Sequence, residues 1–113
     1  MEFKLVISDM VLVKVAGFYK DEKGVQRKFD FELECDRVSQ EELKASHEDT
    51  TEHAGQFMKR VTKGWRNQRL VLTADDKPAD YGPEAMDMLL NISGMGGYCW
   101  QSYLRDVLVH EKN

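Results

Sequence analysis

The sequence predicts an α+β fold, in which N-terminal antiparallel β-strands or a hairpin are followed by three to four helices packed on the sheet. Strand-like alternation is confined to residues 3–36, and helical periodicity with capping residues begins after residue 39. A chain of 113 residues is most simply one domain, 1–113, with strands over about 3–36 and a helical part over about 39–110.

The predicted strands are rich in β-branched and aromatic residues, first in FKLVI at 3–7 and then in MVLVKVAGFY at 10–19. A polar turn follows, in which Gly24 can adopt a positive φ. The next strand alternates two kinds of residue, Phe29, Phe31, Leu33 and Cys35 with Asp30, Glu32, Glu34 and Asp36. Because successive side chains of a strand point to opposite faces, we expect one buried face and a row of carboxylates on the other.

Two helices are expected in the middle of the chain. Ser39 and Glu42 match a capping box at the start of a short helix. A stronger helix is expected from about Thr51 to Lys63, and Gly64 is placed to end it in the left-handed conformation. Its apolar residues recur along one stripe, as Ala54, Phe57, Met58, Val61 and Trp65.

The last third of the chain predicts two further helices. Residues 69–78, RLVLTADDKP, fit either one more strand that runs into an Asp-rich turn or an extended loop. Pro83 suits the first position of a helix, and Glu84 complements the positive end of its dipole. Ser93 and Gly94 end this helix, and a last helix is expected from about Gly97 to His110. GMGG at 94–97 is interpreted as a turn or a helix entry, since it lacks the spacing of a phosphate-binding loop.

The helix that begins at Pro83 carries more apolar surface than a helix on a sheet needs. Its apolar side chains span an arc of about 200°, about twice the width of an ordinary core-facing stripe. Either the last two helices cover each other, or they offer apolar surface to a partner, and the methionines favour a surface that accepts varied helical partners. The expected partner-binding residues are Met86, Met88, Leu89, Leu90, Trp100, Tyr103 and Leu104.

No catalytic, cofactor-binding or metal-binding residues are predicted. His47 and His53 lie in a polar stretch where we expect them to be exposed, and His110 is near a terminus. Cys35 and Cys99 have no cysteine partner at a metal-binding spacing, so we expect reduced, apolar core residues. A nucleophile, a base and an orienting group cannot be assembled from these residues, which predicts that the protein is not an enzyme and binds no cofactor.

The charges are segregated along the chain, although the net charge is only -4. Residues 30–52 hold nine acids against two bases, and residues 53–77 hold six bases against two acids. The basic group fits a solvated face, contact with an acidic protein surface, or binding of a nucleic-acid backbone with a base stacked on Trp65. The negative net charge disfavours nucleic-acid binding. It consists of Lys59, Arg60, Lys63, Arg66 and Arg69. Opposite charges on one chain also suggest a head-to-tail homo-oligomer.

The stretch from Gly64 to Tyr103 resembles the tail assembly chaperones of long-tailed, siphovirus-like bacteriophages. The elements shared with that family stand in the same order and are Gly64-Trp65, the turn at 75–78, Tyr81, Pro83-Glu84, Leu89-Leu90, Ser93-Gly94 and Tyr103. Gly82 replaces the Ser or Thr cap usual in the family, Ser93 replaces a proline, and the turn is more charged.

The resemblance implies a non-enzymatic protein that binds the helical tape measure protein through apolar helix surfaces and assists tail tube assembly. It further implies the tail tube protein as a possible partner, no nucleic acid, no membrane, and a location in the host bacterial cytoplasm rather than in the mature virion. The start of the chain has no secretory signal and no stretch approaches a membrane span, which agrees with that expectation. The alternative is a small phage-encoded inhibitor that binds a host protein through the acidic strand face at 30–36.

Overall fold

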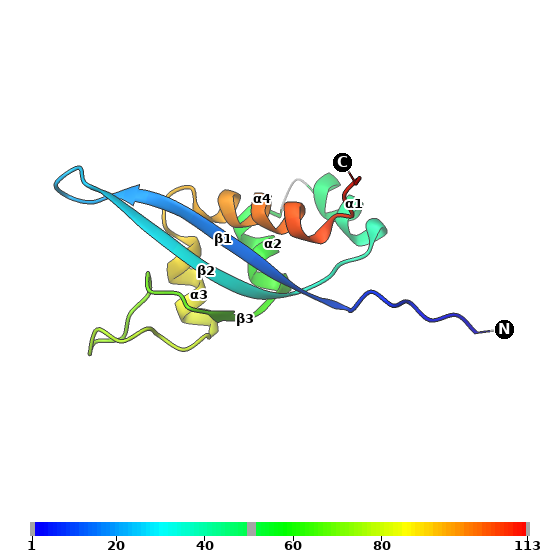
Figure 1. Cartoon of the computed structure of the whole chain (residues 1–113), viewed down its shortest axis with the longest axis horizontal. Helices are drawn as coiled ribbons and strands as arrows, with labels where there is room; N and C mark the ends of the chain where they lie inside the picture. The colour runs from blue at the N-terminus through cyan, green and yellow to red at the C-terminus, as the bar shows by residue number, and fades with distance from the viewer. Residues whose placement is uncertain (1, 50–51, 113) are drawn as a thin grey trace.

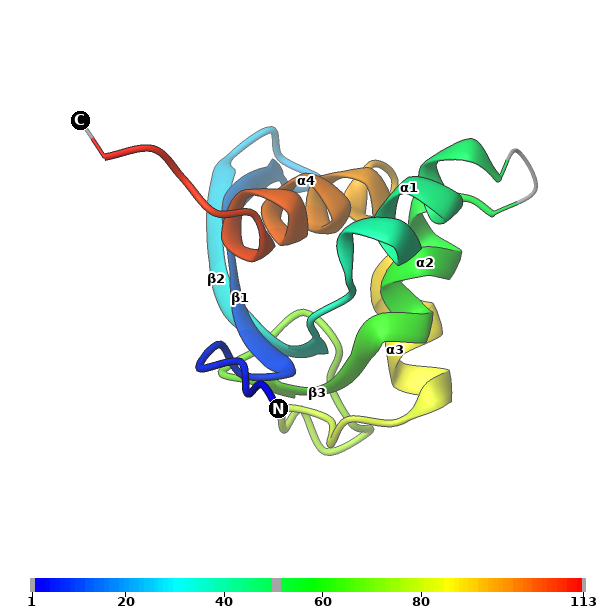
Figure 2. The same ribbon diagram turned by 90° about the vertical axis from the view of Figure 1, so that its right-hand side faces the viewer.

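The computed structural model describes residues 2–49 and 52–112 and confirms the α+β class. The elements are β1 (Met10–Lys20), β2 (Gln26–Asp36), α1 (Gln40–Glu48), α2 (Ala54–Val61), β3 (Thr62–Arg66), α3 (Pro83–Leu90) and α4 (Met95–Val107). Figure 1 shows the long β1–β2 hairpin running along the molecule, and Figure 2 shows the helices gathered on one side of it.

The sheet is antiparallel throughout and has the order β1-β2-β3. The hairpin turn is as predicted, because Gly24 has φ of 76°. Asp21 stabilises this turn, since its Oδ1 accepts the backbone N–H groups of Lys23 and Val25 at 2.9 Å each. The alternation in β2 is also confirmed: Phe31, Leu33 and Cys35 are buried, whereas the intervening acids are exposed or half-buried.

The predicted strand at residues 3–7 is wrong. This segment forms no strand and extends beyond the end of β1, away from the other elements (Figure 1). Its composition suits a strand, but no neighbouring strand lies beside it to accept its backbone hydrogen bonds, and strand propensity alone does not supply them.

The predicted helix over 51–63 is too long at its C-terminal end, and its first residue, Thr51, lies outside the described residues. The helix ends at Val61, and Thr62–Arg66 forms β3 against β2. Gly64 therefore lies opposite Glu34 in a strand and is not a left-handed helix cap, while Trp65 lies opposite Leu33. The open edge of β2 offers this segment a ladder of backbone hydrogen bonds, which periodicity within one helix cannot reveal.

Residues 67–82 form an extended loop with a single isolated bridge between Leu72 and Pro78, which decides between the two interpretations of RLVLTADDKP. The loop is organised around Gln68, whose side chain is buried. Its Nε2 donates to the carbonyls of Val71 at 2.9 Å and Ala79 at 3.1 Å. Its Oε1 accepts the N–H groups of Leu70 and Val71. The side chain of Gln68 thus forms hydrogen bonds with backbone groups of the loop, which in a sheet would pair with a neighbouring strand.

Three of the helices lie at increasing distance from β1, in the order α4, α2, α3. Helix α4 lies on β1, α2 packs beside α4, and α3 packs beside α2 (Figure 2). Gly94, with φ of 82°, precedes α4, so GMGG is a helix entry as predicted. The helix begins at Met95 rather than Gly97 and ends at Val107 rather than His110. The buried apolar side chains form one cluster: Val13, Val15, Phe31, Leu33, Cys35, Phe57, Met58, Val61, Val71, Met86, Leu89, Met95, Cys99, Tyr103 and Val107.

Candidate binding groove

A groove of about 660 Å³ lies between α1 and the paired helices α2 and α4. We call it the α1 groove. Its apolar lining comes from three elements and consists of Leu43 of α1, Ala54 and Phe57 of α2, and Trp100 and Leu104 of α4, with Leu108 just beyond α4. Figure 2 shows α1 set apart from the sheet, above the end of α2.

Helix α1 forms because its first turn is fully capped, as predicted. Ser39 Oγ accepts the N–H of Glu42 at 3.1 Å, and Glu42 Oε1 accepts the N–H of Ser39 at 3.5 Å. None of the residues of α1 is buried, and Leu43 and Ser46 are the half-buried ones. The helix forms one wall of the groove, and its half-buried Leu43 packs against the edge of the core.

Two contacts attach the C-terminal half of α1 to the rest of the molecule. The ring of His47 stacks on that of Trp100, with centroids 6.4 Å apart and planes 10° apart. Ser46 Oγ donates a hydrogen bond to Glu52 Oε1 at 2.7 Å. Both contacts are made by partly exposed polar groups, so they can be broken without opening the core.

The floor of the groove is rigid by comparison. Phe57 is buried and meets the ring of Tyr103 edge-on at 5.4 Å. Arg60 lies over the Phe57 ring at 5.1 Å and binds both carboxylate oxygens of Glu52, at 3.0 and 3.1 Å. The hydrogen bonds from Arg60 and then from Ser46 lower the pKa of Glu52, which keeps this carboxylate charged at the rim.

The seven expected partner-binding residues are divided between the core and two separate surfaces. Met86, Leu89 and Tyr103 are 0% exposed and belong to the core of the subunit. Met88 is 63% exposed on α3, and Leu90 is half-buried.

Of the seven expected partner-binding residues, only Trp100 and Leu104 line the α1 groove. The periodicity of α2 correctly assigned Phe57 to the core, where it also forms the base of the groove. Sequence reasoning missed Leu43 as a groove residue, because α1 offered only one large apolar residue.

The charged residues form cross-strand pairs. Lys63 lies 3.5 Å from Asp36, Arg66 lies 3.6 Å from Glu34, and Asn67 donates to Glu32 at 3.3 Å. The acidic row of β2 is therefore matched by the basic side chains of β3.

Lys59 of the basic group and the neighbouring Trp65 have partners on a helix and a loop. Lys59 pairs with Asp87 at 2.8 Å. Trp65 donates from Nε1 to the carbonyl of Ala79 at 3.1 Å and meets Tyr81 edge-on at 5.2 Å. Trp65 is thus packed and hydrogen-bonded against the loop rather than presented as a stacking platform for a nucleotide base.

The cysteines and histidines lie where the sequence predicts them. Cys35 and Cys99 are free, 0% exposed thiols, and burial raises their pKa to about 11 and about 12 respectively. His47 and His53 are exposed. Within residues 2–49 and 52–112, no three His, Cys, Asp or Glu side chains gather in a way that could hold a metal ion.

Comparison of the chain with protein-family models, curated proteins and solved structures finds no match. Among the described residues, no helix has the length and apolar character needed to cross a membrane.

Proposed function

We propose that the protein is a tail assembly chaperone of a long-tailed bacteriophage and that it binds helical segments of the tape measure protein in the α1 groove. The observation that carries the proposal is the groove itself, an apolar floor of Phe57, Trp100 and Leu104 beneath a helix that has no buried residue. The ordered resemblance over 64–103 supports the identity of the client.

The chemistry of the groove suits the apolar face of an amphipathic helix. Such a helix inserts large side chains at i, i+3, i+4 and i+7 into an apolar channel and leaves its polar side at the rim. The groove combines an apolar floor with rim residues such as Glu48, Glu52 and Lys44, which can meet that polar side.

The size of the groove implies that α1 moves when the client binds. Its volume of about 660 Å³ is within the range of small-molecule pockets, so it holds a few side chains rather than a whole helix. Because α1 has no fully buried residue and is attached through the packing of Leu43, the His47–Trp100 stack and the Ser46–Glu52 hydrogen bond, it can shift outward without opening the core. The client thus replaces contacts of α1 while the core stays closed.

The alternative, an inhibitor that acts through the acidic strand, is not favoured by the same observations. A charge mimic needs unpaired carboxylates, whereas Glu34 and Asp36 already face Arg66 and Lys63 across the sheet. A host partner would have to displace these cations before it could bind.

The proposal is tested by co-expression with the tape measure protein of a long-tailed bacteriophage, followed by measurement of the soluble and co-purified tape measure fraction. Wild-type protein is expected to keep the client soluble, and Trp100→Ala and Leu104→Asp are expected to reduce the co-purified fraction at least several-fold. Met88→Ser is the matched control, because this exposed residue lies on α3, outside the groove.

Two outcomes would contradict the proposal. A client that stays insoluble beside the wild-type protein removes the chaperone function. Full binding by both groove variants, with loss of binding by Met88→Ser, moves the partner surface from the α1 groove to α3.

A further inference from the structure

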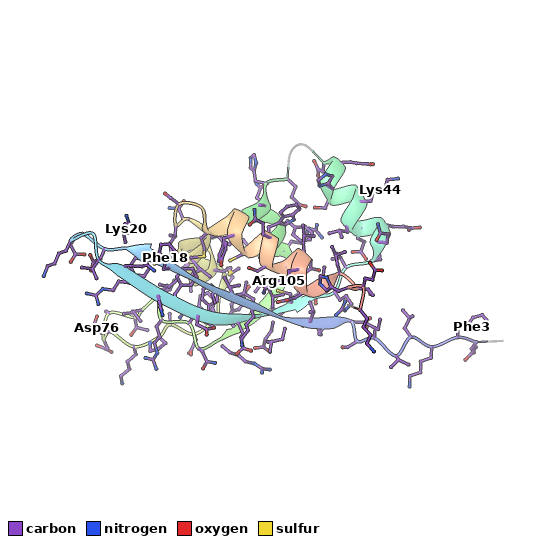
Figure 3. All side chains as sticks on the ribbon, turned by 45° about the horizontal axis from the view of Figure 1, so that its top comes forward. Phe3, Phe18, Lys20, Lys44, Asp76 and Arg105 are labelled. Carbon is purple, nitrogen blue, oxygen red and sulfur yellow. The ribbon has the colours of Figure 1, made fainter. Side chains whose placement is uncertain are left out.

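The N-terminal segment 3–7, which we call the arm, exposes large apolar side chains that no described part of its own subunit covers. Phe3 is 89% exposed, Leu5 83%, Val6 98% and Ile7 52%. Lys4 is the only charged residue within it. Figure 3 shows Phe3 at the far end of this extended segment, well beyond the sheet. A short, extended and almost wholly apolar segment of this kind is typical of a segment that binds another protein surface.

We infer that the arm of one copy binds in the α1 groove of a second copy, so that the protein associates with itself head to tail. The groove supplies the apolar surface that the arm lacks, through the half-buried side chains of Leu43, Trp100 and Leu104. The arm in turn supplies side chains that cover this floor when no client is present.

The charges of the two surfaces are complementary. Glu48 stands on the groove rim at the C-terminal end of α1, where the helix dipole is also negative. Lys4 of an incoming arm complements the negative charge at this end of the rim.

Geometry favours a second copy over the same subunit. The arm continues the direction of β1 outward, away from the helices (Figures 1 and 2). Its base is fixed, since the carbonyl of Asp9 accepts the N–H of Arg37 at 2.6 Å and the N–H of Met10 donates to Ser8 Oγ. To enter its own groove, the arm would have to reverse at Ser8 and Asp9 and give up these hydrogen bonds.

The arm cannot be accommodated as an added strand at the centre of β1. Both the N–H and the carbonyl of Lys14 are hydrogen-bonded to side chains of α4, and the carbonyl of Ala16 accepts from Tyr98. This part of the strand edge is closed, whereas the α1 groove is open to an incoming segment. Because the arm and the groove are different surfaces, their contact is heterologous and leads to a ring or an open chain of subunits.

This inference goes beyond the proposed function and does not depend on the identity of the client. If both hold, the arm and the client compete for one groove. A variant without the arm is then expected to bind the tape measure protein at least as tightly as the full chain. Client binding and arm binding can therefore be tested, and contradicted, independently of each other.

The test is a complementation experiment by sedimentation velocity. One variant lacks residues 2–7 and keeps its groove, and the other carries Leu104→Arg and keeps its arm. The full chain is expected to sediment as larger species as its concentration rises, and each variant alone as a monomer. The two variants mixed are expected to form a one-to-one complex, since one supplies the arm and the other the groove.

Two further variants keep the test decisive. Leu108→Arg, at a 43% exposed groove residue, replaces Leu104→Arg if that variant fails to fold. Lys4→Glu is expected to weaken association about tenfold at low salt, because it places a negative charge against a negative rim. The thermal unfolding of each variant checks that the fold is intact.

Three results would overturn the inference. The first is a full chain that stays monomeric at every concentration. The second is self-association of the groove variant alone, which indicates arm-to-arm pairing. The third is a synthetic peptide of residues 2–8 that binds the arm-deleted protein while the full chain remains monomeric, which indicates that the arm occupies its own groove.

Discussion

The carboxylate of Asp106 accepts a hydrogen bond at 2.9 Å from the backbone N–H of Lys14, although 92 residues separate the two in the sequence. The adjacent Arg105 donates to the carbonyl of the same lysine, and Tyr98, two turns earlier in α4, donates to the carbonyl of Ala16. Three side chains of α4 thus cover the middle of the outer edge of β1, at Lys14 and Ala16. Exposed strand edges pair readily with other chains, so α4 protects the sheet from non-specific association.

Replacing Asp106 with alanine is expected to lower the free energy of unfolding by about 1 kcal/mol, because a charge-assisted hydrogen bond is lost at a partly exposed site. Urea unfolding at neutral pH measures the change. Asp30→Ala is the matched control, since this carboxylate lies exposed on β2, and it is expected to have little effect. Equal destabilisation by the two variants would contradict a role for Asp106 at the strand edge.

Stability is expected to fall in acid, in part through Asp106. Its hydrogen bond with Arg105, and further the bond from Lys14, lower its pKa in the folded state. A lowered folded-state pKa contributes stability that is complete above the unfolded pKa of about 3.9 and is lost as the pH falls through the folded-state value. Asp106→Asn should therefore flatten the decline in unfolding free energy below about pH 4, as urea titrations from pH 7 downward would show.

Tyr103→Phe is expected to cost about 1–3 kcal/mol of unfolding free energy. The Tyr103 hydroxyl donates to the carbonyl of Asp36 at 2.7 Å and accepts the N–H of Val38 at 3.1 Å, and removing it leaves both backbone groups without this partner. Tyr19→Phe, at a 46% exposed residue of the hairpin, tests the loss of a hydroxyl at the surface. Chemical denaturation of both variants should separate them clearly.

Two adjacent residues of α3 should respond in opposite ways to truncation. Leu89 is 0% exposed, so Leu89→Ala creates a cavity and is expected to cost about 2–5 kcal/mol. Met88 is 63% exposed, and Met88→Ala should change stability by no more than about 0.5 kcal/mol. Thermal unfolding of both variants would show whether α3 is oriented as described.

The thiols of Cys35 and Cys99 should be unreactive in the folded protein. Burial and the raised pKa values, about 11 and about 12, keep both as inaccessible thiols at pH 8. A colorimetric disulfide reagent is expected to label neither residue until denaturant is added, and then to label both. Rapid labelling of Cys99 without denaturant would mean that α4 opens locally.

The sequence predicts well those features that depend on neighbouring residues. The alternation in β2, the Gly24 turn, the Ser39–Glu42 capping box and the start of α3 at Pro83 each follow from local chemistry, and each is present. The division of the apolar arc of α3 into a buried side and an exposed Met88 needs knowledge of which helix lies beside it. Periodicity measures how much surface is apolar, but not what covers it.

The features that sequence reasoning missed depend on contacts between distant segments. Strand β3 forms because β2 has an open edge at that point, and Gly64 fits there because a β-carbon would lie 2.9 Å from Glu34 Oε1. Gln68 gives no local signal at all, since its four hydrogen bonds exist only once the loop has closed around it. The α1 groove was missed for the same reason, because three helices must assemble before it exists.

The contacts that close the edge of β1 have a consequence for biosynthesis. Helix α4 is the last element of the fold to leave the ribosome, so the hairpin is made long before Tyr98, Arg105 and Asp106 can cover it. During that interval the nascent chain exposes an open strand edge and lacks one wall of its groove. Mutations that slow the docking of α4 should therefore reduce the yield of folded protein in cells by more than their effect on the purified protein indicates.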